Sequence, residues 1–216
     1  MVLFETARTM WHLGRGAALK PPALGRDWVW LTRTNPLDLD LLGHVNNSKY
    51  ATLAELARWR LTAPSGILQA SIKNKWSFVV SEQAIAYKRS ILPSTRFEIR
   101  TRVHTEPGEN KWVYFDHDFV SPGAADAEYR FDGDGPPLPL PGGDDRTLYC
   151  TVRAKCVLKQ GRKTIYHDEL RQHSPYIDGA MAFAEEQRQL RSAAAAAVGV
   201  APAGDEPLGA ASKLWP

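Results

Sequence analysis

The sequence predicts an α+β fold in which one long helix lies against an antiparallel β-sheet. Two observations predict it. Residues 47–61 repeat apolar side chains at helical spacing, and the segments before and mostly after them alternate apolar and polar residues as strands do. Because the later strands follow one another along the chain without an intervening helix, neighbouring strands are expected to run antiparallel.

The first strand and the helix come early. Residues 28–33 are predicted to form a strand, and Pro64 and Gly66 are predicted to end the helix. Leu56 and Trp59 widen the apolar face of this helix, which indicates burial on most sides. The face itself is built from residues three and four positions apart: Tyr50, Leu53, Ala54, Ala57 and Leu61.

Further strands follow the helix. Cys150 and Cys156 lie on one apolar face of the longest of them, so they are about 20 Å apart and cannot pair with each other. We interpret both cysteines as core residues. The predicted strands are residues 77–89, 97–103, 111–120 and 148–158, and after a turn at 160–162 a short strand at 164–166.

Residues 28–176 are predicted to form the domain, and the other segments differ in composition. Residues 1–27 form an N-terminal arm, either a helical segment packed on the domain or an acid-poor transit peptide. Residues 122–145 hold five Gly, five Pro and five Asp and are predicted to be a long acidic loop. A last helix is expected at 177–191. The Ala-rich residues 192–216 are expected to form a tail, because their side chains bury too little area to fold.

The composition excludes several classes of protein. The 216 residues include 27 Lys and Arg against 24 Asp and Glu, and a net charge of +3 is too small to indicate a nucleic-acid partner. No apolar run approaches the roughly 20 residues that span a bilayer. No residue cluster has metal-ligand spacing, so we expect no metal and no cofactor. We expect a cytoplasmic protein, or a mitochondrial or other organellar one if the arm is a transit peptide.

Residues 38–50, Asp-Leu-Asp-Leu-Leu-Gly-His-Val-Asn-Asn-Ser-Lys-Tyr, combine two carboxylates, an imidazole and two carboxamides just before the helix. Asn46, Asn47 or Ser48 can cap the helix, whose first N–H groups would then polarise a carbonyl oxygen. A nearby carboxylate can act as a general base on water or attack the carbonyl directly. Gly43 permits a tight or left-handed turn and the close approach of a ligand.

This stretch resembles the loop D-x-D-x-x-G-H-V-N-N-x-x-Y of hotdog-fold thioesterases of the 4-hydroxybenzoyl-CoA thioesterase type. With residues 55–60, Glu-Leu-Ala-Arg-Trp-Arg, the chain most resembles the thioesterase superfamily member six group. The resemblance covers about residues 28–176. It implies a long central helix wrapped by a curved antiparallel sheet, in a homodimer or larger assembly with active sites at the subunit interface. It also implies hydrolysis of a fatty-acyl or related thioester of coenzyme A or acyl carrier protein.

The resemblance assigns a role to each motif residue. Asp40 matches the catalytic carboxylate, as general base or nucleophile, and His44 and Asn46 match residues that orient substrate or water. Asp38 is expected to be structural. The expected substrate-binding residues are Gly43, Val45, Asn47, Tyr50, Lys88 and Arg89, the last two as partners of coenzyme A phosphates. Other cations considered for the phosphates are Lys73, Lys75, Arg100 and Arg102.

The similar plant acyl-carrier-protein thioesterases place a catalytic Asn two residues after the key Asp, where this chain has Leu42. That difference leaves a second hypothesis open: a non-catalytic protein of the same fold that binds acyl-CoA or lipid, or acts as a scaffold. Glu55 is interpreted as a solvent-exposed helix residue. The alternative is that Glu55 is a second acid near the site. Arg58 and Arg60 are interpreted as surface or interface ion-pair partners.

Overall fold

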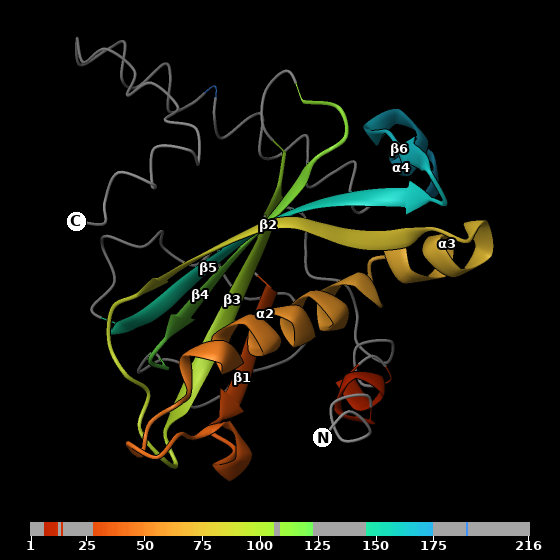
Figure 1. Ribbon diagram of the computed structural model, residues 1–216. Helices are drawn as coiled ribbons and strands as arrows, with labels where there is room; N and C mark the ends of the chain where they lie inside the picture. Colours follow the sequence, from red (N-terminus) through yellow and green to blue (C-terminus); the bar gives the residue numbers. More distant parts are fainter. Residues whose placement is uncertain are drawn as a thin grey trace, which may run out of the picture.

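The computed structural model describes residues 7–12, 14, 28–105, 109–122, 146–174 and 189. The predicted α+β architecture is confirmed: the long helix α2 (Asn47–Thr62) runs along one face of a curved antiparallel sheet (Figure 1). The helix begins and ends within a residue of the range predicted from its apolar spacing. Residues 7–12 of the N-terminal arm are helical.

The sheet has the strand order β1-β3-β4-β5-β2, and every neighbouring pair is antiparallel. Strand β2 follows β1 in the chain but lies at the opposite edge, so α2 and α3 (Ile67–Asn74) cross the sheet between them. Among the described residues, β2 pairs with β5 alone, which leaves its other edge open. The strands are β1 (Trp28–Arg33), β2 (Ser77–Tyr87), β3 (Arg96–His104), β4 (Val113–Val120), β5 (Leu148–Gln160) and β6 (Lys163–Ile165), which pairs with β5.

The core lies between α2 and the sheet. Leu53, Ala54 and Ala57 of α2 are buried against the concave face of the sheet, in one cluster with Ile99 and Phe119. A second cluster continues the core toward α3 and β6, and its buried members are Trp28, Leu61, Ile67, Ala70, Trp76, Val113, Phe115, Ala154, Cys156, Leu158, Ile165 and Leu170. The core therefore fixes the direction of α2 and, with it, the loop that precedes the helix.

The two cysteines behave as predicted. Cys150 and Cys156 are both free and completely buried on one face of β5. Burial raises the pKa of the Cys150 thiol to about 12 and that of the Cys156 thiol to about 11. Neither thiol is therefore a nucleophile near neutral pH.

Three short helices were missing from the sequence prediction. The 3-10 helix η1 (Pro36–Asp38) precedes the motif, α3 follows the predicted stop at Gly66, and α4 (His167–His173) lies after β6. Gly66 is the N-cap of α3, with a φ of 82°, so the glycine both ends one helix and begins the next. The loop at 123–145 and the tail at 192–216 lie outside the described residues, as does the helix expected at 177–191 except for Gln189, which is helical.

The outward face of the sheet carries ion pairs, which corrects the view of Arg100 and Arg102 as free cations. Arg100 donates to Glu98 at 3.0 and 3.1 Å, and Arg102 pairs with Asp118. Burial raises the pKa of the neighbouring Asp116 carboxyl. Hydrogen bonds and charges from His104 and Arg153 lower it by more, so the pKa of Asp116 lies well below its usual range. Arg100 and Arg102 are thus engaged within the domain and were wrong candidates for a phosphate site.

Candidate active site

The loop before α2 is closed by its own backbone. Asp40 N–H donates to the carbonyl of His44 at 2.9 Å, and Gly43 N–H donates back to the carbonyl of Asp40 at 3.1 Å. Leu39 and Val45 form an isolated antiparallel bridge at the base of the loop. Gly43 has a φ of 76°, the left-handed conformation that its position in the motif predicts.

The carboxylate of Asp40 is held by the same loop. Its Oδ1 accepts a hydrogen bond from Leu42 N–H at 2.9 Å and a longer one from His44 N–H at 3.5 Å. Its Oδ2 lies 3.2 Å from His44 Nδ1. The side chains of Asp40 and His44 are 22% and 27% exposed to solvent. The pair is therefore oriented by its hydrogen bonds and remains open to solvent.

The start of α2 follows this pair in the chain, two residues after His44. Asn46 is the N-cap, and its side-chain oxygen accepts hydrogen bonds from Ser48 N–H at 2.9 Å and from the Ser48 hydroxyl at 2.7 Å. The carboxamide of Asn46 thus stabilises the helix start, while its expected catalytic role stays a prediction. The capped N-terminus carries partial positive charge, and the loop that holds Asp40 leads directly into it.

The first acid of the motif has a different environment. The carboxylate of Asp38 is buried and accepts a bidentate pair of hydrogen bonds from Arg8, at 2.9 and 3.0 Å. Lys49 Nζ lies 3.9 Å from the same carboxylate. Asp38 therefore connects the N-terminal arm, η1 and α2, in keeping with the structural role expected for it.

Two expected substrate-binding residues lie in the core beneath the loop. Val45 is buried, and its N–H donates to the carbonyl of Ile91 at 2.9 Å. Tyr50 is buried edge-on against Tyr87 and Phe119, and burial raises the pKa of its phenol to about 12. Both side chains support the loop from below, and their contact with substrate stays a prediction.

The end of β2 adjoins the helix start. Tyr87 donates its hydroxyl to the carbonyl of Asn47 at 3.0 Å, and the exposed Lys88 and Arg89 follow directly. Both of their N–H groups bond the carbonyl of Tyr149, at 2.8 and 3.0 Å. The fold thus brings these two cations to the motif.

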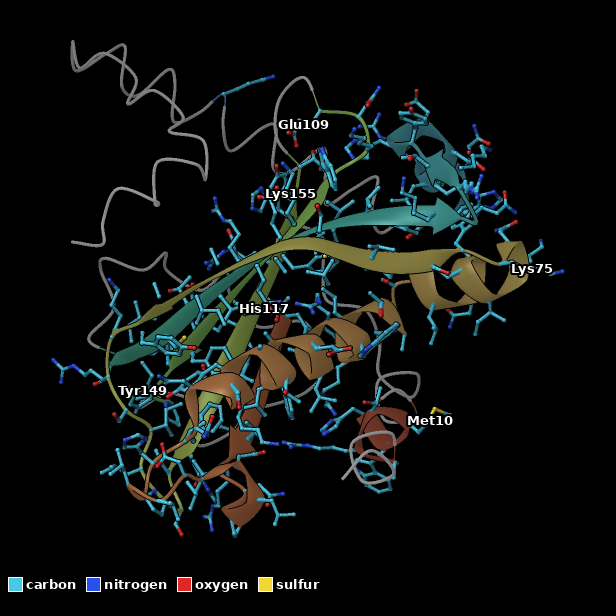
Figure 2. All side chains as sticks on the ribbon, in the orientation of Figure 1. Met10, Lys75, Glu109, His117, Tyr149 and Lys155 are labelled. Atoms are coloured by element: carbon cyan, nitrogen blue, oxygen red, sulfur yellow. The ribbon has the colours of Figure 1, made fainter. Side chains whose placement is uncertain are left out.

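The other two candidate lysines lie elsewhere. Lys73 is near the end of α3 and Lys75 is its C-cap, at the beginning of β2 rather than its end. Figure 2 shows Lys75 and Tyr149 at opposite ends of the molecule. Lys73 and Lys75 are therefore poor candidates for contacts to a ligand that reaches Asp40.

A shallow groove between α2 and β2 contains a buried arginine, Arg58, which the sequence analysis assigned to the surface or to an interface. Arg58 is 7% exposed, and its one hydrogen bond within the described residues joins Nη1 to Nε2 of His117, 3.5 Å away. His117 Nδ1 lies 2.9 Å from the hydroxyl of Thr101, and burial, followed by the charge of Arg58, holds the pKa of His117 well below its usual value. The groove is lined by Glu55, Arg58, Trp59 and Thr62 of α2 and by Phe78 and Val80 of β2.

The helical spacing contains a signal for this burial. Arg58 lies four residues after Ala54 and three before Leu61, so it belongs to the apolar face. Arg60 is buried too, with its guanidinium over the ring of Trp30 at 5.2 Å, so of its two alternatives, surface or interface, the surface one is wrong. Glu55 is exposed, as expected, and accepts a hydrogen bond from Trp59 Nε1 at 3.4 Å.

Comparison with known proteins decides the family. Residues 34–172 match the family model of the thioesterase-like superfamily. The chain belongs to this superfamily. Protein THEM6 of Xenopus laevis is 38% identical over 91 residues, and Protein THEM6 of Danio rerio is 32% identical over 84. The alignments cover 40% and 39% of this chain and 44% and 41% of those proteins, so the chain spans less than half the length of the curated relatives it matches.

Solved structures of other thioesterase-like proteins share the fold. YbaW, a probable thioesterase from Escherichia coli, superposes with a TM-score of 0.51 at 18% identity, over 71% of this chain and 98% of that one. The DHNA-CoA thioesterase of Staphylococcus aureus also gives a TM-score of 0.51, at 16% identity, over 77% of this chain and 95% of the other. The predicted hotdog fold and the resemblance to the thioesterase superfamily member six group are confirmed.

The described residues contain neither a cluster of metal ligands nor a membrane-spanning helix. Within residues 7–12, 14, 28–105, 109–122, 146–174 and 189, no three His, Cys, Asp or Glu side chains are grouped to hold a metal ion. No helix in the same described part of the chain has the length and hydropathy to cross a bilayer.

Proposed function

We propose that the chain hydrolyses acyl thioesters of coenzyme A and that Asp40 is its catalytic carboxylate. The observation that supports the proposal is the way this carboxylate is held. Leu42 N–H fixes one oxygen at 2.9 Å, His44 Nδ1 lies 3.2 Å from the other, and the side chain remains open to solvent. Membership of the thioesterase-like superfamily supports the class of reaction.

Two reaction routes fit a carboxylate in this position. In the first, Asp40 takes a proton from water as the water oxygen adds to the thioester carbonyl carbon. The intermediate then collapses, the C–S bond breaks, and the proton passes to the departing sulfur. In the second, Asp40 attacks the carbonyl itself, the C–S bond breaks, and water opens the resulting anhydride. Both routes place negative charge on the carbonyl oxygen, which the N-terminus of α2 would stabilise.

The cations beside the motif supply the contacts for the coenzyme A end of the substrate. Lys88 and Arg89 are exposed at the end of β2, next to the helix start, and neither forms an ion pair with a described residue. Coenzyme A carries phosphates, which pair strongly with such side chains. The acyl group would then point toward α2, with its carbonyl at Asp40.

The chain acts as a homodimer in this proposal, with a second copy covering the groove between α2 and β2. Arg58 lines this groove as a buried cation: burial lowers its pKa, and the charge of Glu55 on the same helix raises it. No described carboxylate is in ion-pair contact with Arg58, so a carboxylate supplied by a partner chain would offset the cost of this burial. Glu55 lines the same groove as an exposed carboxylate. A twofold axis makes contacts reciprocal, so Glu55 of each copy can neutralise Arg58 of the other. The open edge of β2 lies beside them.

A panel of acyl-CoA thioesters tests the proposed reaction and separates it from the alternative. The 216-residue chain is expected to release free coenzyme A thiol from at least one of them, and to bind a non-hydrolysable thioether analogue of the same acyl-CoA. Binding without thiol release would instead support the acyl-binding protein that Leu42 suggests. Absence of both binding and release would exclude acyl-CoA as the ligand.

A further inference from the structure

Four leucines at one end of the molecule are exposed to solvent. Leu41 and Leu42 are 105% and 81% exposed, and Leu37 and Leu92 are 63% and 60% exposed. Single exposed leucines are ordinary in soluble proteins. These four differ because they come from two short loops, residues 34–46 and residues 88–95, that lie together. We refer to Leu37, Leu41, Leu42 and Leu92 as the leucine tip.

Hydrogen bonds join the two loops. Thr34 N–H donates to the carbonyl of Thr95 at 3.0 Å, and Val45 N–H donates to the carbonyl of Ile91 at 2.9 Å. Figure 1 shows η1, the loop before α2 and the connection from β2 to β3 meeting at the lower left of the molecule. The tip is therefore a single surface, and Asp40 lies within it, between Leu39 and Leu41.

The charge around the leucine tip is strongly positive. Residues 33–49 and 88–96 contain five basic residues and two acidic ones. Of the two acids, Asp38 is buried and paired with Arg8, so it contributes little at the surface. Four of the basic residues are exposed on the strand ends that flank the tip: Arg33, Lys88, Arg89 and Arg96.

We propose that the leucine tip docks on the surface of an anionic membrane. Leucine side chains gain free energy by leaving water for the boundary of the acyl chains, and basic residues near an anionic leaflet are attracted to its phosphates. An apolar tip surrounded by cations combines both contributions, whereas a phosphate ligand in solution would use only the cations. This inference does not depend on the proposed hydrolysis. Docking would bring Asp40 to the lipid surface, where long-chain acyl groups partition.

Co-sedimentation with lipid vesicles tests the proposal on the 216-residue chain. Vesicles of phosphatidylcholine mixed with phosphatidylserine are expected to bind the protein, and vesicles of phosphatidylcholine alone to bind it much less. The double variant Leu41→Ser/Leu42→Ser should weaken binding by at least about tenfold, because two exposed leucines no longer enter the lipid. Lys88→Glu/Arg89→Glu should weaken it by at least about tenfold as well, because two attractive charges become repulsive.

Matched controls lie at the other end of the molecule. Ile72, on α3, is 71% exposed, and Lys73 and Lys75 are exposed beside it. Ile72→Ser and Lys73→Glu/Lys75→Glu should leave vesicle binding unchanged. Thermal unfolding and size-exclusion chromatography are run on every variant to confirm folding and assembly. The proposal is overturned if the chain does not bind the anionic vesicles, or if the controls weaken binding as much as the tip variants do. A change of oligomeric state in Leu41→Ser/Leu42→Ser, with vesicle binding intact, would also overturn it and assign the tip to a second copy of the chain.

Discussion

Reversing the charge of Glu55 should break the proposed dimer while leaving each subunit folded. Glu55 is exposed, so Glu55→Arg changes no core contact. In the dimer, each Glu55 would pair with Arg58 of the other copy, and Arg58 is only 7% exposed. Removing one partner of such a buried pair at an interface costs about 2–5 kcal/mol of association free energy.

The twofold axis doubles this cost, because one substitution removes both pairs. A lower bound of about 4 kcal/mol corresponds to a roughly thousandfold increase in the dimer dissociation constant. Sedimentation velocity over a range of concentrations measures that constant. Glu169→Arg on α4, which reverses a charge away from the groove, serves as the matched control and should dimerise like the wild type.

Mixing two variants gives the sharpest form of the test. Glu55→Arg places two cations in each groove, and Arg58→Glu places two carboxylates there, so each variant alone should be monomeric. Together they should form a heterodimer, because each groove then meets its opposite charge. Circular dichroism confirms that Arg58→Glu is folded, since this residue contacts His117. A Glu55→Arg protein that dimerises as tightly as the wild type would refute the reasoning.

Three further predictions follow from buried groups. Asp38→Asn should cost about 3 kcal/mol of unfolding free energy in urea denaturation, because it leaves the Arg8 guanidinium without its carboxylate; an unchanged midpoint would contradict the structural role of Asp38. Cys150 and Cys156 should resist a disulfide reagent in the native protein near neutral pH and react after unfolding, since burial raises both pKa values; rapid native labelling would contradict this. The pKa of Tyr50 is about 12 in the folded state and about 10 when unfolded, so stability should fall as pH rises through this window, and less in Tyr50→Phe; identical pH profiles would contradict it.

Local patterns were enough to predict the main elements. The apolar spacing in residues 47–61 predicted α2, and the alternation in residues 148–158 predicted β5, because both patterns record which face is buried. The motif residues, too, were found from the sequence, since they lie within one short loop. Their grouping around Asp40 required no long-range information.

The rest depended on contacts between distant residues. Arg58 and His117 are 59 positions apart in the sequence. Nothing in the sequence around either residue shows that Arg58 will contact a histidine on β4. The ion pair between Arg102 and Asp118 likewise follows from the register of β3 against β4, which the alternation of either strand leaves open. The helix α3 was missed because the glycine that ends α2 also begins the next helix, at a positive φ.

The central claim is that Asp40 performs the chemistry, and thiol release by Asp40→Asn measures it most directly. Asparagine keeps an oxygen that can accept the hydrogen bond from Leu42 N–H, so the loop should stay in place while the base or nucleophile is lost. With an acyl-CoA that the wild type hydrolyses, kcat/KM should fall by about 100- to 10,000-fold. The thioether analogue should still bind, and unfolding should be unchanged. Equal rates of thiol release in Asp40→Asn and the wild type would contradict the account.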